Sequence, residues 1–316
     1  MISLLIPTWN AGRVLEDLLD GLDRQEPRVE LERIAIDSGS TDGTVERLRG
    51  RGFAVHSIPQ KEFNHGATRD LGISLAKGEV VVLLTQDAIP ADESWLRRLL
   101  EPYEDSRVAG VYCRQIPRPD CNPILAERIR NWTAGKTAPI VQEVEGEAAL
   151  EALPPLERLA RCAFDNVASS VRRSIWEKHP FGRRAFGEDV AWGKRVVLAG
   201  HRLVFQPASA VVHSHNRTPL AEFRRLYCDH QNLAELFDVR LIPSSKGLLG
   251  SIRKRRREHL AILDSLPPDE RRRWRTWAKR YAAAELLGIH LGARSREWLA
   301  NGSWWRPVDR WIKRGI

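Results

Sequence analysis

Long apolar runs and cysteine pairs are both missing from this chain of 316 residues. No stretch reaches the roughly 20 apolar residues that a membrane-spanning helix needs, so the sequence predicts no transmembrane segment. The four cysteines, Cys113, Cys121, Cys162 and Cys228, lack CxxC spacing, which argues against a zinc site and against a disulfide framework. A strand pattern already begins at Ile2, so we expect no signal peptide and a cytoplasmic protein.

Two glycine-rich phosphate motifs are missing as well. No GxGxxG follows the first strand pattern and no GxxxxGK[ST] occurs, which disfavours dinucleotide-binding and P-loop proteins. The apolar and charged fractions, 42% and 29%, are ordinary for a globular protein, so the chain can bury a core. Its length suits one large α/β domain with an appendage.

Charge is distributed unevenly along the chain, whose formal net charge is +9. Residues 246–316 hold 18 Lys and Arg against 7 Asp and Glu, whereas the preceding residues hold 32 against 34. The same segment carries 6 of the 11 tryptophans. We therefore predict a near-neutral body over residues 1–240 and a basic, Trp-rich helical extension over residues 241–316.

Apolar strand patterns alternate with helix patterns at the start of the chain. Strands are predicted at 2–9, 31–37, 53–58 and 79–85, with helices at 14–22, 44–51 and 67–77. This alternation is typical of a parallel sheet with helices on both faces. The pattern then weakens, and we predict helices at 95–103, 124–132, 173–178 and 189–199, strands at 108–114, 166–171, 202–205 and 210–213, and a mobile loop at 134–155.

Polar clusters follow several strand patterns, at the edge where ligands of such sheets bind. Asp37 comes directly after the second strand and can accept a hydrogen bond from a uracil- or thymine-type base, although GSTDGT is also an ordinary turn with a helix N-cap. Asp87 ends the cluster Thr85-Gln86-Asp87. Its carboxylate suits Mg²⁺ or Mn²⁺ bound to a diphosphate, or it merely caps a loop.

Two later clusters offer further chemistry. Glu188 and Asp189 precede a helix, where acidic residues favour the helix dipole, but two adjacent carboxylates can also divide a structural role from that of a general base. His213 and, as second choice, His215 lie after the last strand. Either is an ordinary buried histidine or a nitrogen ligand for the metal at Asp87.

The order and spacing of five blocks resemble the family 2 glycosyltransferases, which have the Rossmann-like GT-A fold. The blocks are IPTWN, IDSGSTDGT, FNHGATRDLGISLAKGEVVVLLTQDAIP, GEDVAWGKR and VVHSHN. The resemblance implies an inverting enzyme with a nucleotide half at about 1–115 and an acceptor half at about 116–240. It assigns the nucleotide sugar to Pro7, Thr8, Asn10, Asp37, Arg69, Gln86 and Asp87, the metal to Asp87 and His213, and catalysis to Asp189 beside Glu188.

Two departures from the family pattern stand out. The first carboxylate of the D-x-D metal motif is Thr85 here, and the Asn that follows the family's Arg is Asp70. The motifs FNHGATRD and LLTQDA are most similar to those of the bacterial rhamnosyltransferase branch. This resemblance implies dTDP-L-rhamnose as donor and a glycan or lipid-linked oligosaccharide as acceptor. A UDP-hexose donor and a non-catalytic sugar-binding relative remain alternatives. For the acceptor we predict contacts with Arg114, Asn166 and His179.

The basic extension has three interpretations. Its helices either pack on the body with solvated basic faces, or dock on an anionic membrane surface at the inner face of the cell membrane. Nucleic-acid binding is disfavoured because no nucleic-acid motif accompanies the charge.

Overall fold

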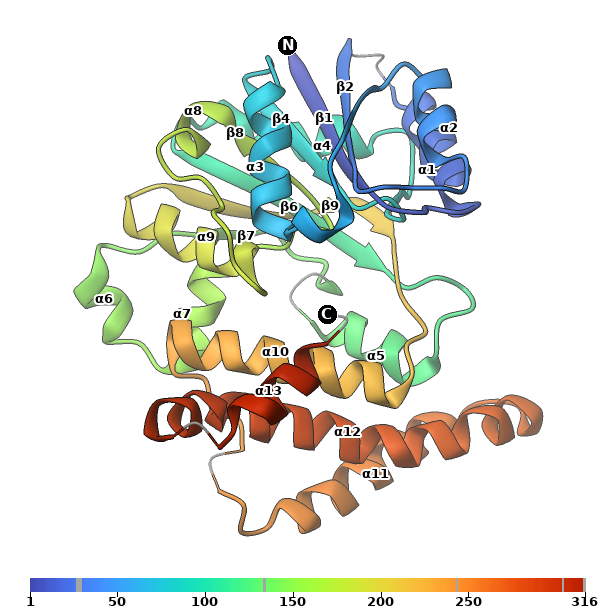
Figure 1. Cartoon of the computed structure of the whole chain (residues 1–316), viewed down its shortest axis with the longest axis vertical. Coiled ribbons are helices and arrows are strands. Elements are labelled where there is room, and N and C mark those ends of the chain that lie inside the picture. The colour runs from blue at the N-terminus through green and yellow to red at the C-terminus, as the bar shows by residue number, and fades with distance from the viewer. Residues whose placement is uncertain (27–29, 133–134, 243, 303, 315–316) are drawn as a thin grey trace. The chain divides into compact units, whose positions relative to one another are not determined.

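The computed structural model describes the chain except for residues 27–29, 133–134, 243, 303 and 315–316. The chain divides into two compact units, whose elements are labelled in Figure 1. The first unit comprises residues 1–118, 129–153 and 160–214, and the second comprises 119–128, 154–159 and 215–316. The sequence placed the start of the helical extension near 241, whereas the long C-terminal segment of the second unit begins at 215.

A mixed sheet forms the centre of the first unit. In the described residues it has nine strands: β1 (Ile2–Thr8), β2 (Leu31–Asp37), β3 (Ala54–Ser57), β4 (Val80–Leu84), β5 (Ile89–Pro90), β6 (Val108–Ile116), β7 (Ile140–Gln142), β8 (Ala168–Arg172) and β9 (Arg202–Val212). Their order is β3-β2-β1-β4-β8-β6-β9-β5, and β7 also pairs with β9. The first four positions are parallel, β8 is antiparallel to both of its neighbours, and β9 is parallel to β6. The predicted α/β class is confirmed.

Helices surround this sheet. They are α1 (Val14–Asp23), α2 (Thr44–Gly50), α3 (His65–Leu75), α4 (Trp95–Leu100), α6 (Glu147–Glu151), α8 (Arg173–Trp176) and α9 (Glu188–Leu198), with short 3₁₀ turns η1 (Gln60–Glu62) and η2 (Glu101–Glu104). Two more, α5 (Pro123–Asn131) and α7 (Pro155–Cys162), contain residues of both units.

Strand β1 shows why helices cover both faces of the sheet. Its side chains alternate, so Leu4 and Ile6 join the core beneath α1 and α4, whereas Leu5 points to the opposite face and meets α3. A Cβ built at Gly72 of α3 would lie 2.3 Å from a Leu5 methyl carbon, so only glycine permits this close approach. The apolar run of β4 is buried throughout, as a central strand requires.

Several sequence predictions need correction. Residues 134–155 are not a continuous loop, because β7 and α6 lie within them; both are too short to show a period in the sequence. The strands predicted at 202–205 and 210–213 are one strand, β9, with a register shift against β6 near Cys113. Helix α3 begins at His65 rather than Ala67, because the Asn64 side chain caps it by accepting from the Ala67 amide at 3.1 Å. The helix predicted at 95–103 ends at Leu100 and continues as η2.

The second unit is helical in its described C-terminal segment. It contains α10 (Pro219–Phe237), α11 (Leu248–Asp264), α12 (Pro268–Asn301) and α13 (Arg306–Lys313). Gly288 and Gly292 of α12 let α10 approach closely, since a Cβ at Gly292 would lie 2.3 Å from the Tyr227 carbonyl oxygen. In the part of the chain that the structure describes, no helix is both long and apolar enough to span a membrane.

Candidate functional site

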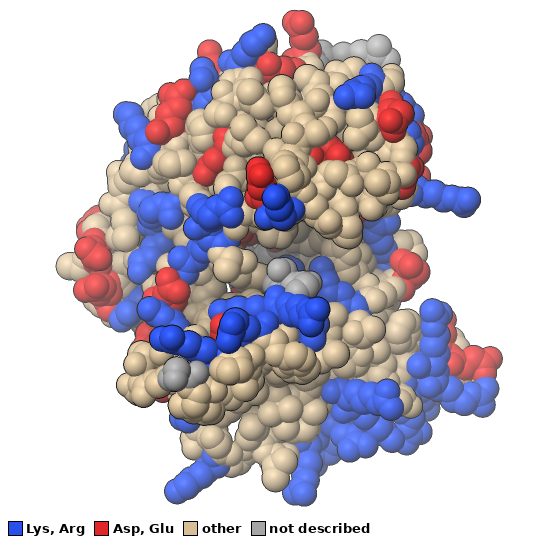
Figure 2. Space-filling model, viewed as in Figure 1, with Lys and Arg blue, Asp and Glu red and all other residues tan. Residues whose placement is uncertain are grey.

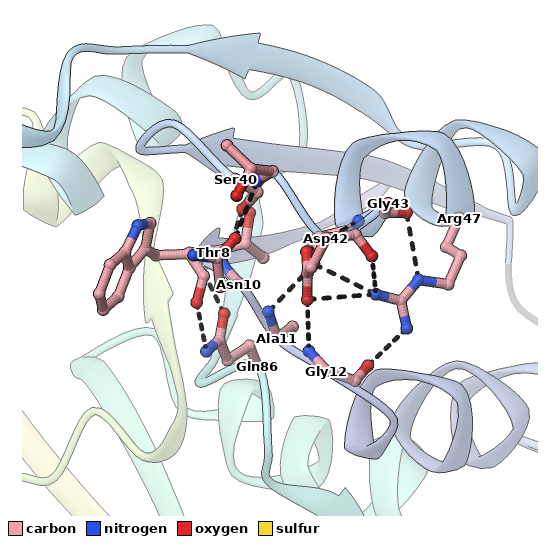
Figure 3. Close-up of polar contacts among 12 residues, drawn as sticks. Thr8, Asn10, Ala11, Gly12, Ser40, Asp42, Gly43, Arg47 and Gln86 are labelled. Carbon is pink, nitrogen blue, oxygen red and sulfur yellow. Dashed lines mark hydrogen bonds and ion pairs between the residues drawn. The ribbon is translucent and has the colours of Figure 1, made fainter.

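The loop after β1 and the loop after β2 are bonded to each other (Figure 3). Thr8 ends β1 directly beside Asp37 at the end of β2. The Thr8 hydroxyl donates to the Asp37 carboxylate at 3.2 Å, and the Ser38 amide donates to the Thr8 carbonyl at 2.9 Å. Asn10, with a left-handed φ of 42°, donates its amide to the Ser40 hydroxyl at 2.8 Å. The two loops therefore form one rigid edge beyond the strand ends.

Asp37 is the centre of the second loop and is only 2% exposed. One of its carboxylate oxygens accepts from the amides of Gly39 and Ser40, both at 3.0 Å. The other accepts from the Ser40 hydroxyl at 2.5 Å. The carboxylate thus shapes its own loop; its predicted contact with a base stays a prediction.

Asp42 and Thr44 complete this edge, and sequence reasoning gave them no role beyond a helix cap. The N-cap of α2 is Gly43, which has no side chain to cap with. Asp42 instead accepts from the Gly12 amide at 3.0 Å, and Thr44 accepts from the Ala11 amide at 3.0 Å. The signal was the STDGT block itself, in which four oxygen-bearing side chains surround a turn.

The three residues Thr85-Gln86-Asp87 after β4 point to three different partners. The Thr85 hydroxyl donates to the Val167 carbonyl at 3.4 Å. Gln86 bridges to the first loop, since its side chain accepts from the Trp9 amide at 2.8 Å and donates to the Trp9 carbonyl at 3.1 Å. Asp87 lies with His213, whose Nε2 is 3.6 Å from the carboxylate.

Asp87, His213 and His215 form a group that can hold a metal ion, because one ligand atom from each lies within 4.8 Å of the others. His213 and His215 lie two positions apart in the chain, just after β9. One carboxylate oxygen and two imidazole nitrogens are suitable ligands for a divalent cation such as Mn²⁺. Thr85 does not contribute to this group.

A buried ion pair lies at the start of α9. The Arg69 guanidinium of α3 donates to the Glu188 carboxylate at 2.8 Å, and the two side chains are 5% and 8% exposed. Asn166 bonds the same carboxylate through its side-chain amide at 3.4 Å. Arg69 and Glu188 therefore form a buried ion pair that joins α3 to the start of α9.

The next residue, Asp189, has different hydrogen-bond partners. Its two oxygens accept from the backbone amides of Val190 at 2.8 Å and Asn166 at 3.3 Å. Burial raises the pKa of Asp189 to about 8, and the neighbouring charges of Glu188 and Asp165 add to the shift. A carboxylate with a raised pKa is a stronger proton acceptor, which is what a general base needs.

Asp70, which replaces the family's Asn, has a structural task. Its carboxylate accepts from the Trp176 indole at 2.7 Å and from the backbone amides of Phe181 and Gly182 at 2.9 and 2.7 Å. It thus anchors the segment that leads from α8 to α9 and to the Glu188-Asp189 pair.

The three residues predicted for the acceptor are not joined in the structure. Arg114 lies on β6 with its Nε buried and unbonded, and Asn166 is 2% exposed with its amide already engaged. His179 follows α8, and its carbonyl accepts from the Trp192 indole at 2.7 Å. In the described part of the chain no hydrogen bond links any two of them, so their role stays a prediction.

Arg118 is a cation that sequence reasoning missed. Its guanidinium donates to the Asp87 carbonyl at 2.7 Å, and its backbone amide donates to the Ser214 hydroxyl at 3.1 Å. It therefore brings a positive charge next to the candidate metal group. The only signal in the sequence was its place in the Pro-rich loop after β6.

Comparison with known proteins places the chain in a family. The model of glycosyl transferase family 2 matches residues 3–150. The O-antigen chain rhamnosyltransferase RfbN of Salmonella typhimurium is 33% identical over 230 residues, which are 72% of this chain and 70% of that protein. WbaN of Salmonella anatum, an O-antigen chain rhamnosyltransferase, is 31% identical over 234 residues, 71% of this chain and 70% of that protein.

Solved structures share the fold. Mannosyltransferase PcManGT from Pyrobaculum calidifontis, in complex with GDP-Man and Mn²⁺, aligns with a TM-score of 0.53 at 18% identity and covers 98% of this chain and 83% of its own. TarS 1-349 of S. aureus, in complex with UDP-GlcNAc, aligns with a TM-score of 0.52 at 14% identity, covering 94% and 91%. With this fold and these relatives, the chain belongs to glycosyl transferase family 2 and has the GT-A fold.

Proposed function

We propose that this glycosyltransferase moves L-rhamnose from dTDP-L-rhamnose to a hydroxyl of a cell-surface polysaccharide or lipid-linked oligosaccharide precursor, with inversion at the anomeric carbon. The choice of rhamnose is supported by the two O-antigen chain rhamnosyltransferases, at 33% and 31% identity. The mechanism rests on a difference between two adjacent carboxylates. Glu188 is paired with Arg69, whereas Asp189 has a raised pKa and can accept a proton.

In this mechanism Asp189 takes the proton of the acceptor hydroxyl as the oxygen attacks the anomeric carbon. The bond between that carbon and the phosphate oxygen breaks, and its electron pair leaves with dTDP. The geometric logic is that of an inverting glycosidase, with an acceptor hydroxyl in place of water. Asp87, His213 and His215 would hold Mg²⁺ or Mn²⁺, which neutralises charge that develops on the diphosphate.

The nucleotide is proposed to lie against the joined loops after β1 and β2, in contact with Pro7, Thr8, Asn10, Asp37 and Gln86. Arg69 is not included among these direct contacts, because its guanidinium donates to the Glu188 carboxylate. The rigidity of this edge supports the proposal: a site whose loops are already bonded to each other loses little conformational entropy when the nucleotide binds.

Calorimetry with a panel of nucleotides and nucleotide sugars, with and without Mn²⁺, tests the donor. We expect dTDP and dTDP-L-rhamnose to bind more tightly than UDP, GDP and their sugars, and the cation to strengthen binding. Tighter binding of a UDP-hexose would mean that the donor is a UDP-hexose, with the mechanism unchanged. This donor is the second candidate, and it is supported by the similarity to TarS in complex with UDP-GlcNAc. A folded protein that binds none of these compounds would instead be a non-catalytic relative.

We also propose that the second unit docks on an anionic membrane at the inner face of the cell. Lys and Arg gather over α11 and the start of α12 (Figure 2). Exposed basic residues of α11 and of the first half of α12 are Arg253, Lys254, Arg256, Arg257, Arg272, Arg273, Arg275 and Arg280. Trp304 and Trp311 near the C-terminus are 62% and 53% exposed, and Trp favours the membrane interface.

Co-sedimentation with vesicles tests this docking in the full-length chain. Replacing Arg253, Lys254, Arg256 and Arg257 with Glu should abolish pelleting with phosphatidylglycerol vesicles. The matched control replaces four exposed cations of the first unit, Arg24, Arg49, Lys61 and Lys77, and should pellet like the original chain. Equal pelleting of both variants would contradict docking through α11, and pelleting with neutral vesicles would contradict the electrostatic basis.

A further inference from the structure

Gln115 connects the candidate metal group to the loop beside the base. It lies on β6, and its side-chain Nε2 donates to a carboxylate oxygen of Asp165 at 2.5 Å. Its Oε1 lies 3.0 Å from Nδ1 of His213. The second carboxylate oxygen of Asp165 accepts from the Val167 amide at 2.9 Å. Gln115 is thus held between an acceptor-only carboxylate and an imidazole ring.

This arrangement fixes the protonation of the ring nitrogens. An ionised carboxylate only accepts hydrogen bonds, so Gln115 must present its NH₂ group to Asp165 and its oxygen to His213. The ring nitrogen that faces this oxygen must then carry the hydrogen, which makes Nδ1 the donor. Nε2 keeps its lone pair, and this is the atom 3.6 Å from the Asp87 carboxylate. A neutral imidazole in this tautomer is ready to bind a metal.

The same short loop also contacts the other end of the site. Asn166, the residue after Asp165, donates its backbone amide to Asp189 at 3.3 Å and its side-chain amide to Glu188 at 3.4 Å. A displacement of this loop would therefore reach both His213, through Gln115, and Asp189. The charges that act on Asp189 are those of Glu188, Asp165 and Arg69.

We propose that Gln115 and Asp165 are positioning residues: Asp165 orients the Gln115 amide, and Gln115 holds His213 as a ready ligand for a divalent cation on the Asp87 side. Through Asn166 the same loop ties the metal group to the carboxylate pair at the start of α9. The part of this inference that concerns His213 stands without the proposed reaction, whereas the link to Asp189 rests on it.

The tautomer of His213 is measured by ¹⁵N NMR of the histidine rings in the metal-free, full-length protein. We expect the Nδ1–H form in the original chain. Gln115→Leu, of similar size, should lose it, because no oxygen then accepts from Nδ1. Gln206→Leu is the matched control: it is a partly buried Gln on β9 that makes no side-chain hydrogen bond within the described residues.

Calorimetry with Mn²⁺ alone gives the functional readout. We expect Gln115→Leu to bind Mn²⁺ about 10- to 100-fold more weakly, the range for loss of a group that orients a metal ligand. Gln206→Leu should bind as the original chain does. An Nε2–H tautomer in the original chain, or unchanged Mn²⁺ affinity in Gln115→Leu, would overturn the proposal. Neither measurement needs a donor or an acceptor, so a wrong donor assignment leaves both readable.

Asp165→Asn tests the link to the base. The substitution removes a negative charge that acts on Asp189, so the acidic limb of the pH–rate profile should move to lower pH. In Gln115→Leu this limb should stay in place, because the charge at Asp165 remains. If these residues were merely structural, the substitutions would change neither the His213 tautomer nor the acidic limb. An unchanged limb in Asp165→Asn would show that the charge of Asp165 does not act on Asp189.

Discussion

Arginine serves two different purposes in the two units of this chain. In the first unit Arg69 is 5% exposed and bonded to the buried Glu188, and Arg118 is bonded to the backbone beside Asp87. In the second unit the basic residues of α11 and α12 mostly face solvent, as Arg256 and Arg257 do. Each bonded arginine of the first unit acts alone, through its position. The exposed basic residues of α11 and α12 act together, through their summed charge.

The difference follows from solvation. A charge held in the interior needs its own partner, because an unpaired buried ion is costly, so each such residue has one specific position. A charge on the surface is screened within about 8–10 Å at physiological salt, so its position can vary but its contribution is small. Substitutions in the site should therefore have large effects one at a time, and substitutions on α11 and α12 should have small effects that add.

The largest effect is expected for Asp189→Asn. Loss of the general base should lower the rate of transfer by about 10²- to 10⁴-fold, because the acceptor hydroxyl no longer has a proton acceptor. Donor binding should stay nearly unchanged, since within the described residues the hydrogen bonds of Asp189 come from backbone amides. Initial rates and donor calorimetry check the two parts. Asp92→Asn, at an exposed position of the first unit, is the control; wild-type turnover in Asp189→Asn would remove Asp189 from the mechanism.

The next effect concerns the stability of the buried ion pair. Arg69→Met leaves Glu188 buried without its cation and should destabilise the protein by about 3–5 kcal/mol. The double variant with Glu188→Met should recover most of this loss. The exposed pair of Arg97 and Glu101 provides the comparison: Arg97→Met should cost about 0–1 kcal/mol. Chemical denaturation measures all three, and equal losses for the buried and exposed pairs would break the distinction between the two kinds of charge.

The pH dependence of stability gives a third test. The pKa of Asp189 is raised from 3.8 to about 8 by burial and by the charges of Glu188 and Asp165. Between these values the folded protein holds a proton that the unfolded chain has released, so this group's contribution to stability is complete below pH 4 and is lost as the pH rises toward 8. The slope is at most about 1.4 kcal/mol per pH unit.

Asp189→Asn should remove this slope. Denaturation curves at pH 5, 6, 7 and 8 should show the variant gaining stability relative to the original chain as the pH rises. The rate of the original chain should increase over the same range, because the base works only when ionised. A stability difference that does not vary with pH would mean that Asp189 keeps its ordinary pKa.

Much of the first unit could be predicted from the sequence because its signals are local. The apolar run of β4 and the spacing of the leucines in α1 define their elements without help from the rest of the fold. The strand patterns likewise placed Asp37 at the ligand-binding edge of the sheet, where the structure shows it beside Thr8. The reversed direction of β8 could not be read, because the pairing of a strand depends on its neighbours in space and not on its own pattern.

The partners of the site residues were the harder part. Nothing in the sequence pairs Arg69 with Glu188, which are 119 positions apart, or places Gln115 between Asp165 and His213. The tail shows the same limit. Nothing in its sequence predicts that the Tyr281 hydroxyl would accept from Arg128 at 2.9 Å. Long-range polar contacts carry no periodic signal, so only the fold reveals them.

The smallest predicted effect tests whether the exposed charges act collectively. Arg257→Gln should weaken binding to phosphatidylglycerol vesicles by about 1 kcal/mol, roughly fivefold, and a second change at Arg253 should weaken it by a similar factor. Arg49→Gln, an exposed arginine of the first unit, should have no effect. Raising the salt concentration should reduce the difference, because these charges are screened. A single substitution that abolished binding would indicate that one arginine of α11 occupies a specific lipid-headgroup site. That arginine would then act by its position, as Arg69 does, and the contrast between the two units would not hold for α11.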